Sequence, residues 1–239
     1  MNLRLFAALD PPDPVRRKLA GWQADLRRSA GRHADEVRWT PADRLHVTLQ
    51  FLGAVPEERL EAVREAMAGA AAGSRPLRLE VHGAGGFPTS RRPRVVWLGL
   101  SGDPGGLAAL AGDLGRRLAP LGFPVEGRPL TPHVTIGRSR DGRGAPGLGG
   151  AIAGAATAEA IPWRAGEISL FRSHLSSEGS RHEVLARFPL GPFRDEAEEK
   201  YAARSPVEAG RRRTAMKNFA IIAFALALQI GFLAQIASL

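Results

Sequence analysis

Two copies of a short motif carry the residues of this chain that are suited to chemistry. His-Val-Thr-Leu occupies residues 46–49 and His-Val-Thr-Ile occupies residues 133–136. Side chains of a strand alternate between its two faces, so in each copy the histidine and the threonine share one face. The valine and the fourth residue point the other way, towards a core. The repetition predicts a duplicated lobe in which the two motif strands face each other across a cleft.

Two imidazoles and two hydroxyls in one cleft suit acid–base chemistry at phosphorus. An unperturbed imidazole titrates near about 6.5, so at neutral pH one ring can be neutral while its partner is charged. In-line displacement at phosphorus needs a base for the attacking water and an acid for the leaving oxygen. The hydroxyls would hydrogen-bond the non-bridging phosphate oxygens. We therefore expect a phosphodiester substrate and a bell-shaped pH profile near neutrality.

A purely structural role is the alternative for either motif, because a histidine in a strand most often makes ordinary packing contacts. The second copy favours the catalytic interpretation, since both motifs follow a Thr-Pro pair. The chain contains no cysteine, which excludes disulfides, thiolate zinc sites and a cysteine nucleophile. We expect no metal and no cofactor, because the remaining histidines show no metal-binding spacing. These are His33, His82, His174 and His182.

The charge balance favours a polyanionic partner. The chain has 33 Lys plus Arg against 24 Asp plus Glu, which gives a net charge of +9. Arginine supplies nearly all of the positive charge, and guanidinium matches the geometry of phosphate, so RNA is the expected partner. The alternative is an arginine-rich surface that reflects compositional bias of the genome. Charge alone does not separate the two interpretations.

Hydrophobic periodicity predicts alternating strands and helices around the motifs. Apolar positions three and four residues apart predict helices at 13–30, 56–72 and about 104–121. Apolar runs predict a first strand near the N-terminus, and a weak Ala-rich segment precedes the last two strands. The other strands are predicted at 45–52, 77–83, 94–100, 133–138, 166–175 and 182–190. This mixture of elements predicts an α+β fold with helices on one face of each sheet.

The chain changes character after residue 192. Residues 193–217 are charged and lack an apolar period, which predicts a linker. Residues 218–239 contain no charged side chain, and a helix of that length is long enough to cross a bilayer. We expect a membrane anchor that leaves the catalytic domain, residues 1–192, in the cytoplasm. Two alternatives are a signal-peptide-like segment joined by a misread gene boundary, and a helix that covers an apolar patch of its own domain.

Several separated blocks of the sequence resemble the 2H phosphoesterase superfamily. Besides the paired motifs they are LRLFAALD, RWTPADRLHVTLQFLG, GGFPTSRRPRVVWLGL and SHLSSEGSRHEVLARFPL. More narrowly, residues 2 to about 190 are similar to the bacterial and archaeal RNA 2′,3′-cyclic phosphodiesterases, also called RNA 2′,5′-ligases. The resemblance implies two pseudo-symmetric sheet-plus-helix lobes around a central cleft, and we expect the protein to be a monomer. It also implies metal-independent hydrolysis of RNA 2′,3′-cyclic phosphate ends to 2′-phosphomonoesters.

The resemblance carries roles onto the two motifs. Opening the ring to leave a 2′-phosphate expels the 3′ oxygen. We assign His46 as the proton donor to that oxygen and His133 as the proton acceptor from water, while the symmetry of the motifs leaves the reverse assignment open. Thr48 and Thr135 match the motif positions that contact phosphate.

Two further candidates lie five residues after the histidines. The resemblance makes Phe51 and Arg138 candidates for contacting the nucleoside and the phosphate. Strict alternation would turn both side chains away from the histidines, so they reach the cleft only if each strand ends or bulges. A separate loop carries Arg91, Arg92 and Arg94. That loop either meets RNA phosphates or is a solvated hairpin tip.

Two other functions stay open at this point. The same site would ligate RNA if a 5′-hydroxyl attacked in place of water. Alternatively, the cleft would be a non-catalytic module that binds RNA or nucleotides. Loss of either motif histidine would have favoured the binding module, and both are present.

Overall fold

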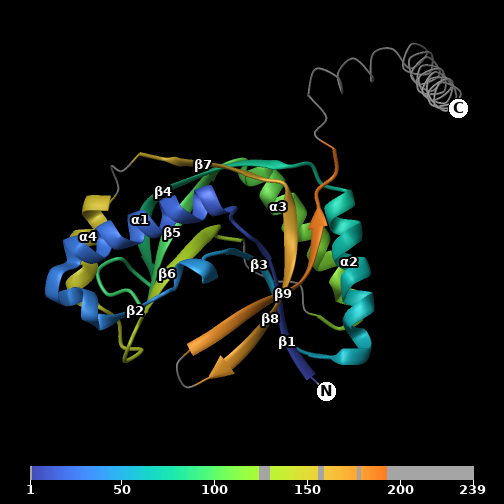
Figure 1. Cartoon of the computed structure of the whole chain (residues 1–239), viewed down its shortest axis with the longest axis horizontal. Helices are drawn as coiled ribbons and strands as arrows, with labels where there is room; N and C mark the ends of the chain where they lie inside the picture. The colour runs from blue at the N-terminus through green and yellow to red at the C-terminus, as the bar shows by residue number, and fades with distance from the viewer. Residues whose placement is uncertain (1, 124–129, 156–158, 177–178, 193–239) are drawn as a thin grey trace, which may run out of the picture. The chain divides into compact units, whose positions relative to one another are not determined.

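The computed structural model describes residues 2–123, 130–155, 159–176 and 179–192, and its two antiparallel sheets are seen in Figure 1. The four-stranded sheet has the order β3-β1-β8-β9 and the five-stranded sheet has the order β2-β6-β5-β4-β7. In the first sheet the strands are β3 (Val47–Pro56), β1 (Asn2–Leu9), β8 (Glu167–Ser176) and β9 (Gly179–Pro189). In the second they are β2 (Val37–Trp39), β6 (His133–Ser139), β5 (Val95–Gly102), β4 (Leu77–Phe87) and β7 (Ile161–Ala165).

Each sheet has its own pair of helices. Helices α1 (Asp13–Ala30) and α4 (Gly149–Gly154) pack on the five-stranded sheet. Helices α2 (Leu60–Ala72) and α3 (Pro104–Leu118) pack on the four-stranded sheet. Figure 1 shows the two pairs beside different sheets. This arrangement confirms the predicted α+β fold of two sheet-plus-helix lobes.

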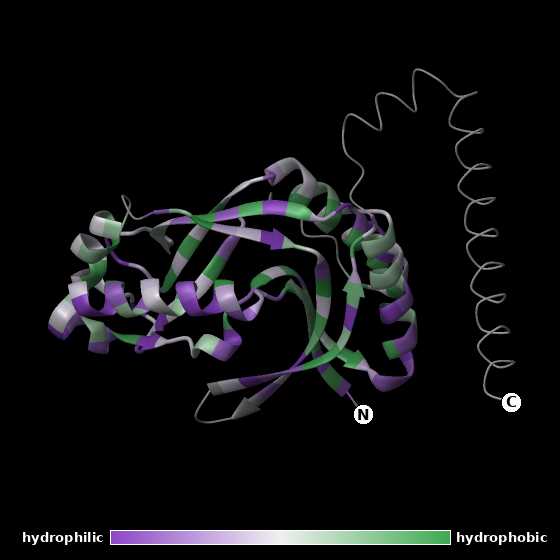
Figure 2. Ribbon diagram, turned by 45° about the horizontal axis from the view of Figure 1, so that its top comes forward, coloured by the Kyte–Doolittle hydropathy of each residue, from purple (hydrophilic) through white to green (hydrophobic). Residues whose placement is uncertain are grey.

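Helices α1, α2 and α3 form where the apolar periods predict them, whereas α4 lies in a Gly-rich and Ala-rich segment where no helix was predicted. In α1 the positions Val15, Leu19 and Leu26 are buried, while Arg17 and Lys18 between them face solvent. Helix α3 begins after Asp103, whose side chain accepts a hydrogen bond from the Gly106 amide at 2.9 Å and caps the helix. Alternation of hydrophobic and hydrophilic residues along these elements is visible in Figure 2. The amphipathic pattern therefore sets the positions of these helices, and a side-chain cap adds to it at the start of α3.

Two short strands were not predicted, and both lie at the edges of the five-stranded sheet. Strand β2 has three residues, too few to show a period of two. Strand β7 alternates between buried and exposed residues but contains Pro162, and proline is tolerated only at sheet edges. Edge position is a property of the assembled sheet, so the sequence pattern alone left both strands out.

The chain passes between the lobes more than once. Strand β1 belongs to the four-stranded sheet, but the helix that follows it packs on the other sheet. The hairpin β8–β9 returns at the end of the described chain, and β8 pairs with β1 from residue 5 to residue 8. Each lobe is therefore completed by segments far apart in the sequence.

The predicted linker at 193–217 and the predicted membrane anchor at 218–239 lie outside the described residues. Among the described residues, no helix is both long and apolar enough to cross a membrane.

Candidate active site

A cleft of about 450 Å³ lies where the two sheets meet. Strand β3 contacts β6 at this junction, so the two motif strands lie close together. The lining includes all six residues singled out in the sequence, and none of its residues is an aspartate or a glutamate. The six are His46, Thr48, Phe51, His133, Thr135 and Arg138. The structure thus brings together both motifs and both of the residues that follow them.

The two catalytic candidates are held in the same way. The Nδ1 atom of His46 lies 2.7 Å from the Arg44 carbonyl oxygen, and Nδ1 of His133 lies 2.7 Å from the Thr131 carbonyl oxygen. A carbonyl can only accept, so Nδ1 carries the hydrogen and donates it in both rings. In each ring Nε2 is the nitrogen left to accept or donate a proton in the cleft.

A β-bulge follows each His-x-Thr pair. In β3 the register with β1 moves from Gln50 to Thr48, which leaves Leu49 unpaired. In β6 the register with β5 moves from Gly137 to Thr135, which leaves Ile136 unpaired. Two buried residues therefore follow one another in each strand, and the next side chain returns to the cleft face.

The bulges explain how Phe51 and Arg138 reach the cleft. Phe51 is 59% exposed, an unusual exposure for a large apolar side chain. Arg138 is exposed as well, and its charge acts on His133. The loop arginines Arg91, Arg92 and Arg94 are exposed but do not line the cleft.

The walls around the two histidines differ. The ring of His46 lies 4.9 Å from that of Phe6, which stacks on Phe171 at 5.0 Å. His133 meets the ring of Phe87 edge-on at 5.1 Å and lies 6.3 Å from Trp97. These distances join ring centroids. His46 thus packs on a stacked aromatic pair, whereas His133 packs against Phe87 and Trp97, whose rings are tilted relative to each other with centroids 5.3 Å apart.

Burial makes both histidines weak bases in the ligand-free cleft. Burial is the largest cause that lowers the pKa of His46, to about 4, and the nearby His182 lowers it further. The Arg44 carbonyl opposes these effects. The pKa of His133 is also lowered, first by burial and then by the charge of Arg138. Both rings are therefore neutral at pH 7 before a substrate binds.

A third histidine in the cleft was not predicted. His182 of β9 lines the cleft and packs edge-on against His46, with ring centroids 5.3 Å apart. Burial lowers the pKa of His182, and the charge of Arg44 lowers it further. Its Nε2 lies 3.2 Å from the Ser180 hydroxyl oxygen. The signals in the sequence are that Ser180 and His182, two residues apart in a strand, share a face and that both lie in the last block of the family resemblance.

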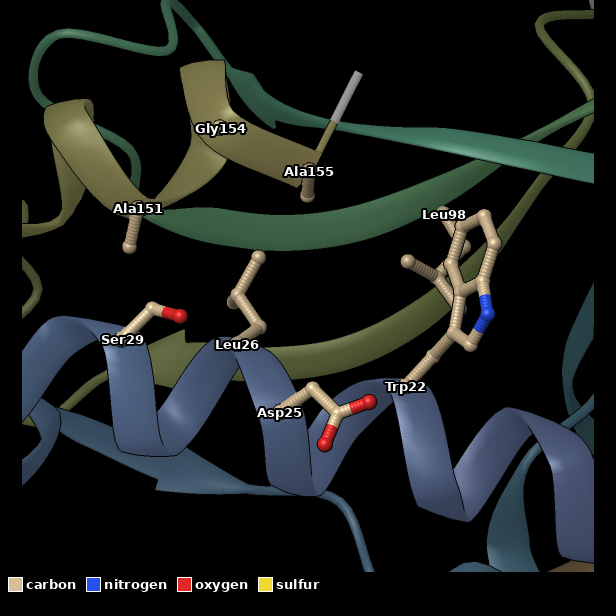
Figure 3. Close-up of a pocket in the computed structure, with 8 residues that line it drawn as sticks. All are labelled: Trp22, Asp25, Leu26, Ser29, Leu98, Ala151, Gly154 and Ala155. Atoms are coloured by element: carbon tan, nitrogen blue, oxygen red, sulfur yellow. The ribbon is translucent and has the colours of Figure 1, made fainter. Parts of the chain in front are cut away.

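A second cavity, of about 180 Å³, lies between α1 and α4 (Figure 3). Its walls are mostly hydrocarbon, and its carboxylate, Asp25, is ion-paired with Arg28. The lining residues are Trp22, Asp25, Leu26, Ser29, Leu98, Ala151, Gly154 and Ala155. This cavity holds no pair of groups suited to proton transfer, so the cleft with the two motifs is the candidate active site.

Candidate metal ligands are scattered in the described part of the chain. No group of three or more His, Cys, Asp or Glu side chains lies close enough there to hold a metal ion.

Comparison with known proteins identifies relatives along most of the described chain. A family model described as LigT like Phosphoesterase matches residues 9–97 and 98–182. An RNA 2′,3′-cyclic phosphodiesterase of Methanothermobacter thermautotrophicus is 31% identical over 190 residues, which are 80% of this chain and 100% of that protein.

Two crystal structures are also similar. A protein of Thermus thermophilus is 28% identical with a TM-score of 0.64, and the match covers 80% of this chain and 100% of that one. Escherichia coli LigT complexed with 3′-AMP is 28% identical with a TM-score of 0.61, over 80% of this chain and 99% of that one.

Proposed function

The chain belongs to the LigT-like phosphoesterase family, and from this premise we propose that it hydrolyses RNA 2′,3′-cyclic phosphate ends to 2′-phosphomonoesters. One observation carries the proposal. Two His-x-Thr pairs line one cleft, and in both the Nδ1 hydrogen is donated to a backbone carbonyl. The name of the Methanothermobacter relative states the same reaction class.

The proposed reaction is an in-line displacement at phosphorus. A water oxygen attacks the phosphorus atom while Nε2 of His133 takes the proton of that water. The bond from phosphorus to the 3′ oxygen breaks, and Nε2 of His46 donates a proton to that oxygen. Each such proton transfer typically contributes about 10²–10⁴-fold to the rate. The hydroxyls of Thr48 and Thr135 donate hydrogen bonds to the non-bridging oxygens.

The donor must gain its proton together with the substrate. His46 has a pKa of about 4 in the ligand-free cleft, so at pH 7 its ring is neutral before the substrate binds. The anionic phosphate next to the ring favours the charged imidazolium and raises its pKa. A donor that burial has made more acidic also releases its proton more readily to the leaving oxygen. The reverse assignment of the two histidines is tested by a substrate with a sulfur leaving atom at the 3′ position. That atom leaves without a proton, so the donor is the histidine whose loss it rescues.

The residues after the bulges recognise the substrate in this proposal. Phe51 is exposed in the cleft and offers a ring face on which a nucleobase can stack. Arg138 lies near His133. Its guanidinium group can donate two parallel hydrogen bonds to two oxygens of the phosphate. Escherichia coli LigT has been crystallised in complex with 3′-AMP, which supports a nucleotide as the kind of ligand.

Hydrolysis of a defined RNA end tests the proposal. The full chain is incubated with an oligonucleotide that ends in a 2′,3′-cyclic phosphate, in water enriched in ¹⁸O, with and without EDTA. We expect a 2′-phosphomonoester that contains one ¹⁸O atom, at a rate that EDTA does not change. A 3′-phosphate product, or activity that EDTA abolishes and a divalent cation restores, would contradict the mechanism. Addition of a 5′-hydroxyl oligonucleotide to the same reaction reports ligation.

The location of the enzyme is a separate proposal. The uncharged segment 218–239 follows three consecutive arginines at 211–213, as expected for a membrane anchor with a cytoplasmic catalytic domain. Fractionation of cells that express the full chain, or a chain ending at Pro192, tests the anchor. If both chains stay in the soluble fraction, the anchor is wrong.

A further inference from the structure

The cleft contains more positive charge than one phosphate needs. Four arginines line it, without any carboxylate in the lining. Elsewhere many arginines are paired with acids, as Arg187 is with Glu167 at 3.2 Å. In the described part of the chain, none of the four cleft arginines lies within 4.0 Å of a carboxylate oxygen. The four are Arg4, Arg38, Arg44 and Arg138.

Two of these arginines are direct cross-strand neighbours. Arg38 of β2 is paired with Arg138 of β6 in the antiparallel register, and both side chains are exposed. Residues opposite one another have Cβ atoms about 4.5–5.5 Å apart, and like charges at such positions destabilise a sheet. An anion between the two arginines would therefore stabilise the pair. Because no carboxylate lines the cleft, a ligand has to supply that anion.

The position of the pair indicates which anion it takes. Strand β6 presents His133, Thr135 and Arg138 to the cleft, so Arg138 is the inner member, next to the reacting phosphate. Arg38 is one strand further out, on the edge strand β2. Neighbouring strands are about 4.8 Å apart, and both arginines line the same cleft as His133. An oligonucleotide whose last phosphate lies at His133, and whose chain continues past Arg138 towards the edge of the sheet, would bring its preceding phosphate to Arg38.

We propose that Arg38, beside Arg138, binds the phosphodiester that joins the terminal nucleotide to its 5′ neighbour. The inference rests on the proposed function and makes it more specific. The enzyme acts on oligonucleotide ends in preference to nucleoside 2′,3′-cyclic phosphates. A mononucleotide has no second phosphate, so it leaves Arg38 without a ligand.

Two substrates separate the second phosphate from the first. The full chain is assayed with adenosine 2′,3′-cyclic phosphate and with the dinucleotide ApA that ends in the same group. For the wild type we expect kcat/KM of the dinucleotide to be at least about tenfold higher, the size of one hydrogen bond to a charged group. Arg38→Gln is expected to reduce this ratio by roughly tenfold. Arg17→Gln is the matched control, because it removes the same charge from an exposed position on α1 outside the cleft.

A change in the substrate, combined with Arg38→Gln, gives a double-perturbation cycle. A methylphosphonate linkage removes the charge of the second phosphate without changing the reacting group. In the wild type it should reduce kcat/KM about as much as Arg38→Gln does. In Arg38→Gln it should have little further effect, because the interaction is already lost. Thermal unfolding of each variant shows whether the fold is intact.

The outcomes separate the inference from the proposed function. If the wild type hydrolyses both substrates with equal kcat/KM, or if Arg38→Gln leaves their ratio unchanged, the second phosphate site is wrong and the proposed function stands. If the wild type hydrolyses neither substrate, the proposed function itself is overturned.

Discussion

The two halves of the cleft share a backbone design and differ in their surroundings. In both, a histidine ring donates its Nδ1 hydrogen to the carbonyl two residues earlier, and a bulge follows the threonine. His46, however, lies deeper, on the stacked rings of Phe6 and Phe171 and beside His182. His133 is less enclosed and lies near the charge of Arg138. The repeated motif thus sets the tautomer and direction of each ring, whereas unrelated neighbours set its acidity.

The residues after the bulges extend the difference. In the first half the side chain after the bulge is Phe51, which offers an apolar ring face. In the second half it is Arg138, which offers a positively charged guanidinium group. One half is therefore suited to a nucleoside and the other to phosphate, although both side chains reach the cleft by the same distortion. Duplication supplies equivalent positions, and the residue type at each position decides its use.

The largest effect should come from removal of either histidine. His46→Ala and His133→Ala should each lower kcat for cyclic-phosphate hydrolysis by at least about 10²-fold, because each removes one proton transfer. Steady-state kinetics measure this loss. His174→Ala is the matched control, since His174 lies on the same hairpin as His182 but pairs with Glu183 outside the cleft. A histidine variant with near-wild-type kcat would remove that residue from the mechanism.

Removal of the hydroxyls should have a smaller effect. Thr48→Ala and Thr135→Ala each lose one hydrogen bond to a non-bridging oxygen, while both proton transfers remain. We expect kcat/KM to fall about tenfold for each, the size of one hydrogen bond to a charged group. Thr→Ser at either position should restore most of the activity, because it returns the hydroxyl. A loss as large as that of the histidine variants would mean that the threonines have another role.

The pH profile distinguishes the ligand-free cleft from the occupied one. The pH dependence of kcat/KM reports the free enzyme, and that of kcat reports the complex. The pKa values of both free histidines are lowered, so the kcat/KM maximum should lie below pH 6.5, whichever ring is the acid. Bound phosphate raises both values, so the kcat maximum should lie at a higher pH. A bell-shaped profile near neutrality is thereby expected for kcat alone. If the maxima of kcat and kcat/KM lay at the same pH, the proposed effect of bound phosphate on the two pKa values would be wrong.

The smallest effect concerns the third ring. His182→Asn removes a group whose charge lowers the pKa of His46. The pKa of His46 should therefore rise, but it should stay below 6.5 because burial is the larger cause. Titration of the His46 Cε1–H signal by NMR measures the change, with His174→Asn as the control. An unchanged or lower pKa would show that His182 does not act on His46 through its charge.

The sequence by itself predicted three of the helices, most of the strands and the four motif residues of the candidate site. Apolar spacing predicted helices α1, α2 and α3, because residues three and four positions apart lie on the same face of a helix. The two tetrapeptides predicted a paired site, because the histidine and threonine of a strand share a face whatever the rest of the fold. For Phe51 and Arg138 the sequence stated only the condition, a bulge in each strand, under which they would reach the cleft.

The tertiary structure alone decided what depends on distant segments. His182 reaches His46 only because β8 pairs with β1 and carries β9 beside it. Arg38 faces Arg138 only because β2, which no sequence period predicted, pairs with β6. The lowered pKa values follow from burial by rings and strands of both lobes. Burial and cross-strand pairing both depend on contacts between residues that are far apart in the chain, so they cannot be read from a short stretch of sequence.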